Sequence, residues 1–242
     1  MEGAAMTQAA GAERRPRRGR GSIKTEDIID GAFELAEQVS IDNLSMPSLA
    51  KHLGVGVTSI YWYYRKKDDL LDAMTDRVWG KYDTITPFID PYNWRESLAN
   101  HARSMRKAFR KNAILTDLVL IRGALGPASR REGLRQMEMA IASLVHAGLT
   151  PEDAFDTYSA LSVLVRGSVV MERLHQKTRE TEGEDAHDRA TLVNIESAPL
   201  IAKMMGEGHR LAVADTHNFE FMMTCILDHA EQAIALGARS AD

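Results

Sequence analysis

Residues 44–64 read LSMPSLAKHLGVGVTSIYWYY, and their spacing is typical of two short helices joined by a tight turn. Ser45 is placed to cap the first helix, and Pro47 falls in its first turn, where a proline costs least. Gly54 stands at the end of that helix, where a left-handed residue is usually needed. A second short helix starts after the turn. This arrangement predicts a helix-turn-helix motif.

The remainder of the chain also reads as helices, because apolar residues recur at three- and four-residue intervals. The alternation of apolar and polar residues that indicates strands is absent from the sequence. We therefore predict an all-α fold. In the second half of the sequence, helices are expected over residues 94–111, 113–123, 128–147, 151–178 and 217–237. The polar residues 178–190 are expected to form a loop.

The composition is that of an ordinary soluble globular protein, with 44% hydrophobic and 26% charged residues in 242. A single cysteine, Cys225, excludes a disulfide framework, and its apolar neighbours indicate a core or interface residue. No stretch approaches the ~20 apolar residues of a membrane span. We therefore expect a cytoplasmic protein with no membrane partner.

The eight histidines show no spacing typical of a metal site, and no phosphate-binding glycine loop is present. We expect no metal, no cofactor and no catalytic residue.

Charge is distributed unevenly, although the net charge is only −4. Residues 1–24 carry six basic and two acidic side chains, whereas residues 25–75 carry four basic and nine acidic ones. A DNA contact must therefore be local and geometric. Residues 1–22 contain too little apolar material to order themselves, so we expect a disordered basic arm. The arm could enter a minor groove, or it could be a non-specific tail or an untouched leader.

Residues 44–71 closely resemble the DNA-binding segment of the TetR family of repressors. The resemblance lies in LAKHLGV at 49–55, SIYWYY at 59–64, Lys67 and the pair Leu70-Leu71. It is weaker beyond residue 80, but GLTPEDA at 148–154 is similar to the core of the tetracycline-repressor subgroup.

The resemblance implies a three-helix DNA-binding domain, a connecting helix and a larger helical domain that binds a ligand and dimerises through a four-helix bundle. The expected organisation is a disordered arm at 1–22, a helix-turn-helix domain at 23–67, a connecting helix at 68–84, and a ligand-binding and dimerisation domain at 85–242.

The second helix of the motif is expected to lie in a major groove of double-stranded DNA. Ile60 and Tyr64 share one face and should pack on the domain core. The opposite face carries Thr58, Ser59, Trp62 and Tyr63. Exposed aromatic rings are costly unless something covers them, and groove contact would supply that cover. The alternative is that Trp62 lies against the neighbouring helix.

Phosphate contacts are implied by the resemblance for Tyr61 and Lys67. For Lys67 the alternative is an ordinary solvated surface lysine. Ser45 could cap its helix and also touch a phosphate, or it could serve as a cap alone.

By resemblance, the residues that line the ligand pocket are His101, Met105, Val119, Arg122, Tyr158, Leu161, Ser162 and Val165. His101 and Arg122 could bind a carboxylate or a phenol-like oxygen, or each could form an internal hydrogen bond. Val119 and Met171 stand where the tetracycline repressor holds magnesium-tetracycline, so a metal-tetracycline inducer is not expected. Because polar residues in this set are few, we expect a mostly apolar small molecule.

The resulting hypothesis is a homodimeric, ligand-responsive transcriptional repressor on a palindromic operator. A ligand would shift the connecting helix and change the separation of the two recognition helices. Three alternatives remain open at this point: a transcriptional activator of the same fold, a small-molecule binding protein with an inert helix-turn-helix, and an all-α enzyme that uses His101 as a base.

Overall fold

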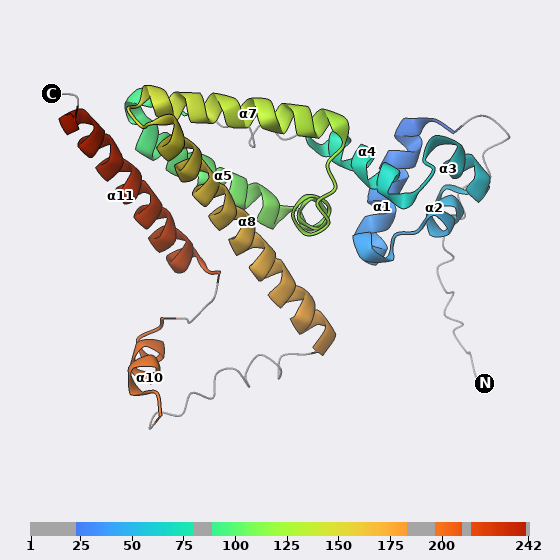
Figure 1. Ribbon diagram of the computed structural model, residues 1–242. Coiled ribbons are helices and arrows are strands. Elements are labelled where there is room, and N and C mark those ends of the chain that lie inside the picture. Colours follow the sequence, from blue (N-terminus) through green and yellow to red (C-terminus); the bar gives the residue numbers. More distant parts are fainter. Residues whose placement is uncertain (1–22, 80–88, 183–196, 210–213, 241–242) are drawn as a thin grey trace, which may run out of the picture. The chain divides into compact units, whose positions relative to one another are not determined.

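The computed structural model describes residues 23–79, 89–182, 197–209 and 214–240 (Figure 1). These residues form helices and connections without a β-strand, which confirms the all-α prediction. The chain divides into two compact units, one that ends at Lys67 and one that begins at Asp68. We call the first unit the head and the second the body.

The helices of the head are α1 (Thr25–Asn43), α2 (Met46–Leu53) and α3 (Val57–Tyr63). The body contains α4 (Lys67–Trp79), the short 3-10 turn η2 (Pro91–Asn93), α5 (Trp94–Lys111), α6 (Ala113–Leu115), the π-helical turn η3 (Thr116–Ile121), α7 (Pro127–His146), α8 (Pro151–Glu182), α10 (Pro199–Gly206) and α11 (Thr216–Ser240).

The head is closed by the apolar faces of its three helices. Ile28, Leu49 and Ile60, one from each helix, are fully buried. The backbone of α1 breaks at Ser40, which has a φ of 70°. The structure places the N-cap of this helix at Lys24, whose backbone N–H donates to the carboxylate of Asp27 at 3.3 Å.

The two ends of α2 have the chemistry that the sequence predicts. The hydroxyl of Ser45 accepts from the backbone N–H of Ser48 at 3.2 Å, and the Ser48 hydroxyl accepts from the Ser45 N–H at 3.0 Å. Gly54 ends α2 with a φ of 68°, a left-handed conformation that glycine adopts without strain. The helix-turn-helix prediction is confirmed by these elements.

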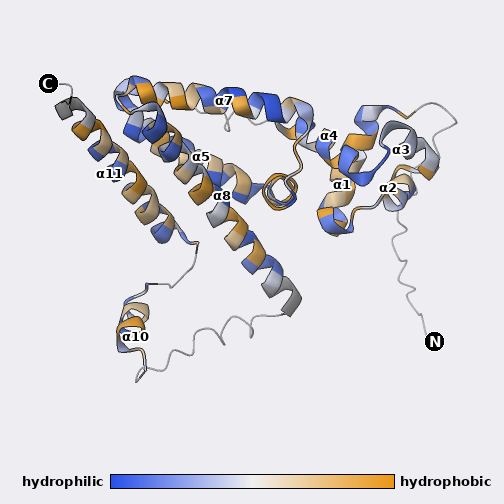
Figure 2. Cartoon of the chain, in the orientation of Figure 1, coloured by the Kyte–Doolittle hydropathy of each residue, from blue (hydrophilic) through white to orange (hydrophobic). Residues whose placement is uncertain are grey.

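In the body, α8 packs against α5, α7 and α11, and apolar bands alternate with hydrophilic ones along these helices (Figure 2). A buried ion-pair cluster fixes η3 to α8. The carboxylate of Asp117 accepts from Nε and Nη2 of Arg173, both at 3.1 Å, and it lies 3.2 Å from Nζ of Lys177. Such a buried carboxylate is stable only because its partners are in place.

Several helix limits differ from the sequence-based expectation. Residues 178–182, expected in a loop, belong to α8, because arginine and glutamate have a high helix propensity. The span 113–123 is divided into α6 and η3, and α10 was not expected. The expected arm at 1–22 lies outside the described residues, as does the end of the connecting helix beyond residue 79. Among the described helices, none is long and apolar enough to cross a membrane.

Candidate DNA-binding surface and ligand cavity

The two faces of α3 are sharply different. Ile60 is fully buried, whereas Trp62 exposes 80% of its surface. Thr58 and Ser59 are also exposed, and Tyr61 is 44% exposed. Trp62 therefore does not lie buried against a neighbouring helix of the head.

Tyr63 is held more closely to the head than Trp62. Its hydroxyl donates to the backbone carbonyl of Ile23 at 2.6 Å, and its ring meets Trp62 edge-on with centroids 4.9 Å apart. The Tyr63 ring consequently contacts the Trp62 indole from the side. Tyr63 is only partly exposed, whereas the sequence predicted that it lies on the exposed face of the helix.

Lys67 lies at the end of α1. Its ammonium donates to the carbonyls of Ile41 at 2.9 Å and Asp42 at 3.3 Å. The last carbonyls of a helix lack partners within the helix and carry partial negative charge, so a lysine is favoured there. The phosphate contact expected for Lys67 stays a prediction, because the structure gives this side chain a second role inside the head.

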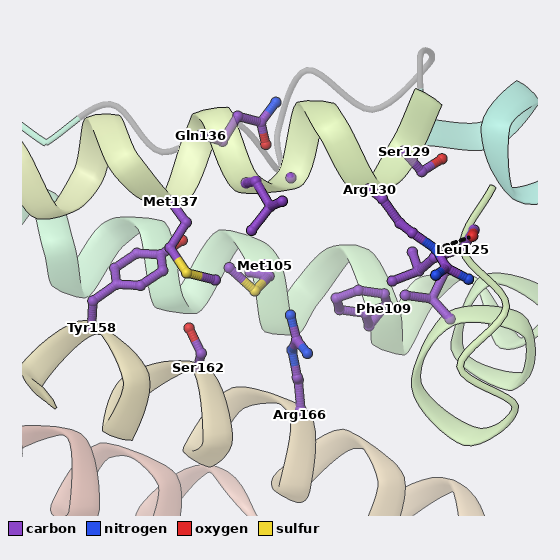
Figure 3. Close-up of a pocket in the computed structure, with 13 residues that line it drawn as sticks. Met105, Phe109, Leu125, Ser129, Arg130, Gln136, Met137, Tyr158, Ser162 and Arg166 are labelled. Atoms are coloured by element: carbon purple, nitrogen blue, oxygen red, sulfur yellow. Dashed lines mark hydrogen bonds between the residues drawn. The ribbon is translucent and has the colours of Figure 1, made fainter. Parts of the chain in front are cut away.

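A cavity of about 300 Å³ lies in the body between α5, α7 and α8 (Figure 3). Its lining comprises Met105, Phe109, Val119, Leu125, Ser129, Arg130, Gly133, Leu134, Gln136, Met137, Tyr158, Ser162 and Arg166. Most of this surface is apolar, and the polar groups come from α7 and α8.

Four of the eight residues expected around a ligand line this cavity: Met105, Val119, Tyr158 and Ser162. Leu161 and Val165 are buried but are not part of the lining, and Arg122 is exposed at the end of η3. His101 lies behind the wall, where its ring stacks on Tyr158 with centroids 6.2 Å apart and an interplanar angle of 12°.

The sequence reasoning missed the wall that α7 contributes, and it missed Arg166. Arg166 follows Ser162 by four residues, as Ser162 follows Tyr158, so the three side chains share one face of α8. That spacing was the available signal for Arg166. For α7 no equivalent signal exists. Apolar residues recur at the same three- and four-residue spacing whether that face of a helix borders a cavity or a packed core.

Burial controls the ionisation of Tyr158, which lines the cavity, and of His101, which lies behind it. It lowers the pKa of His101 to about 4, and Nε2 of this ring has no hydrogen-bond partner among the described residues. Burial raises the pKa of Tyr158, although the positive charge of Arg166 and a hydrogen bond with Ser162 partly offset the effect. At neutral pH both side chains are therefore uncharged.

The start of α7 is tied to α4. The backbone N–H and the hydroxyl of Ser129 both donate to Oδ1 of Asp76, at 2.8 and 2.5 Å. A Cβ atom at Gly126 would overlap the carboxylate of Asp76, so the close approach requires glycine at this position. Because Ser129 also lines the cavity, the segment that forms part of the cavity wall is the one that holds α4.

Exposed apolar side chains follow α8 and α11 in the single chain. They are Phe155, Val163, Met171 and Leu174 on α8, and Phe221, Met222 and Leu236 on α11. Cys225 is exposed on the same helix α11. Apolar residues in such numbers on two helices are typical of a protein–protein contact surface. Within the described ranges, no three histidine, cysteine, aspartate or glutamate side chains gather as a metal site would require.

Comparison with known protein families gives two matches that together span both units. Residues 28–74 match the family described as bacterial regulatory proteins, tetR family, and residues 87–233 match the tetracyclin repressor-like C-terminal domain. The chain belongs to the TetR family of transcriptional regulators. Both descriptions are of transcriptional regulators and not of enzymes.

Individual relatives agree with membership of the TetR family. An HTH-type transcriptional repressor of Mycobacterium tuberculosis is 58% identical over 229 residues, which cover 94% of this chain and 88% of the relative. The class A tetracycline repressor from transposon 1721 of Escherichia coli is 31% identical over 181 residues, which cover 74% of this chain and 76% of that repressor.

Among solved structures, apo ActR from Streptomyces coelicolor superposes with a TM-score of 0.65 at 26% identity, covering 89% of this chain and 100% of ActR. ActR has also been solved in complex with (S)-DNPA.

Replacing His101 by phenylalanine should make the regulator less sensitive to acid. Below the ordinary pKa of 6.5 the unfolded chain protonates His101, whereas the folded chain does so only near a pKa of about 4. The unfolded state thus binds more protons in this window, and the free energy of unfolding falls as the pH falls. In urea unfolding, going from about pH 7 to about pH 5 should cost the wild type about 2 kcal/mol more than His101→Phe.

The matched control is His229→Gln, because His229 is exposed on α11. As the pH falls, the free energy of unfolding of this variant should decrease as much as that of the wild type. Parallel pH profiles for His101→Phe and the wild type would contradict the assignment of a buried neutral imidazole.

Proposed function

We propose that this TetR-family regulator is a ligand-responsive repressor that binds a palindromic double-stranded operator as a homodimer. The observation that carries the proposal is the exposed face of α3, where Trp62 stands out from a head whose other large apolar side chains are mostly buried. A short helix that presents an aromatic ring and hydroxyls can place them against thymine methyls and base edges in a major groove.

Repression is favoured over activation because similar proteins are described as repressors. The mycobacterial protein that is 58% identical along almost the whole chain is described as a repressor, and so is the tetracycline repressor. A repressor needs only to occupy its operator, so no further contact surface is required of it.

A homodimer is supported by the exposed apolar side chains of α8 and α11. Val163 exposes 70% of its surface and Phe221 exposes 65%, which is unfavourable in a monomer in water. Two copies that pair these helices would cover both, as in a four-helix bundle. A twofold dimer would also present two copies of α3, which a palindromic operator requires.

Response to a ligand is supported by the link between the cavity and α4. Leu125, Ser129 and Arg130 line the cavity, and Ser129 holds Asp76 of α4. A mostly apolar molecule in the cavity would press on this segment and displace α4, which begins directly after the head. The ligand needs only to bind the displaced state better than the DNA-bound state.

The proposed roles of Trp62 in contacting bases and of Lys67 in contacting phosphates can be tested with Trp62→Ala and Lys67→Ala. Trp62→Ala should change which sequences are bound, because it removes a contact to base edges worth ~1–3 kcal/mol at particular positions. Lys67→Ala should weaken binding about equally on all sequences and reduce the slope of affinity against salt by about one ion. Affinities are measured by fluorescence anisotropy on a panel of duplexes at several salt concentrations.

Thermal melting serves as the control for Lys67→Ala, because this lysine also caps α1. A loss of affinity with an unchanged salt slope and a lowered melting temperature would assign Lys67 to the head alone. Equal losses on every duplex for Trp62→Ala would contradict base reading by α3.

The link to α4 can be tested with Ser129→Ala in a release assay. A compound first selected for releasing the wild type from DNA should be needed at roughly fivefold or higher concentration with this variant, because the coupling passes through Asp76. Ser143→Ala is the matched control, since within the described residues the Ser143 hydroxyl donates to the Met139 carbonyl on the same helix and to no other acceptor. Identical release of the wild type and Ser129→Ala would remove this route of coupling.

A further inference from the structure

Arg166 differs from the arginines around it. On α5 and α8, Arg103 pairs with Glu220, Arg110 with Glu172 and Arg173 with Asp117. Arg166 makes no hydrogen bond or ion pair with any residue in the described part of the chain, although its positive charge lies close enough to lower the pKa of Tyr158. Its side chain projects from α8 toward the cavity and forms part of the lining (Figure 3).

A second arginine lies across the same cavity. Nε of Arg130 donates to the carbonyl of Leu125 at 2.7 Å, which fixes the guanidinium at the edge of the lining (Figure 3). The hydrogen bond uses Nε and leaves the two terminal nitrogens available for another acceptor. Among the described lining residues there is no aspartate or glutamate, so the cavity carries two positive charges without a carboxylate of its own.

A neutral apolar molecule would be a poor occupant of such a cavity. Arg166 is exposed in the single chain, and a molecule that filled the cavity would cover part of its guanidinium without supplying an acceptor. Covering a charged group without hydrogen bonds costs more free energy than covering a neutral one. A carboxylate, a sulfonate or an acidic phenol matches the planar fork of a guanidinium and forms charge-assisted hydrogen bonds with it.

We propose that the ligand of this cavity is an organic anion with an apolar, aromatic body, whose acidic group is bound by Arg166 with help from Arg130. The hydroxyls of Ser162 and Tyr158, one and two turns before Arg166 on α8, provide further donors along the same face. The apolar body would lie against Met105, Phe109 and Met137, where a ring and two flexible thioether side chains adapt to flat molecules. This proposal rests on the proposed function, in which the cavity is the ligand site.

The test compares two fluorescent probes of similar shape on the full-length chain. Anilinonaphthalene sulfonate carries a negative charge, and N-phenylnaphthylamine is its neutral counterpart. Arg166→Met keeps the length of the side chain but removes its charge and donors. We expect it to weaken binding of the sulfonate about tenfold or more, and to change binding of the neutral probe by less than about twofold.

Two further variants locate the effect. Arg131→Met removes a charge from an exposed arginine that follows Arg130 but is not part of the lining, and it should bind both probes as the wild type does. Met137→Trp fills the cavity, so it should weaken both probes. The anion assignment is overturned if Arg166→Met binds the sulfonate as tightly as the wild type, if it loses both probes equally, or if Met137→Trp leaves sulfonate binding undiminished.

Binding of the same variants to DNA separates this proposal from the proposed function. If the wild type binds duplexes selectively while the sulfonate ignores Arg166, the anion assignment fails and the repressor assignment stands. If the wild type shows no selective DNA binding, the repressor assignment itself fails, whatever the probes do.

Discussion

The burial of Ile60 in the core of the three-helix head is the interaction on which the rest of the head depends. A helix of seven residues is not stable in water on its own, so α3 exists only because one of its faces is sealed. Sealing that face forces the opposite one outward, and Trp62 is therefore 80% exposed. The same packing interaction that stabilises the head thus creates its candidate DNA-reading surface.

The body follows a different rule, in which charged groups inside the helical layers are paired. Asp117 accepts from Arg173 and lies against Lys177, and the buried guanidinium of Arg106 donates to the carbonyl of Ala214 at 2.8 Å. Two side chains at or next to the cavity lack such a partner. His101 is buried, neutral and lacks a partner for Nε2 among the described residues, and Arg166 faces the cavity without an acid beside it.

Much of the fold could be predicted from the sequence because its signals are local. Ser45 and Gly54 mark the ends of α2 by their capping chemistry, and the apolar period marks α5 at its observed limits, Trp94–Lys111. Interactions between distant residues could not be predicted. Nothing in the sequence indicates that Lys67 bonds to carbonyls at the end of α1, or that Tyr63 bonds to Ile23.

In the candidate ligand site, too, some residues could be predicted from the sequence and others depend on the packing of distant helices. Tyr158 and Ser162 were found through the resemblance, whereas the α7 wall depends on where the packing of three helices leaves a void. Arg122 and Arg166 are both exposed arginines of the body, and only the three-dimensional arrangement shows that Arg166 lines the cavity and Arg122 does not.

The proposed DNA reading by α3 is tested most directly by selecting bound duplexes from a random DNA library with the full-length chain. The sequences recovered should share a palindromic site whose half-site centres lie about 10–10.5 base pairs apart, or a multiple of that spacing, because two copies of α3 must reach the same side of the double helix. Recovery of no common sequence, or of a single asymmetric site, would contradict the proposal.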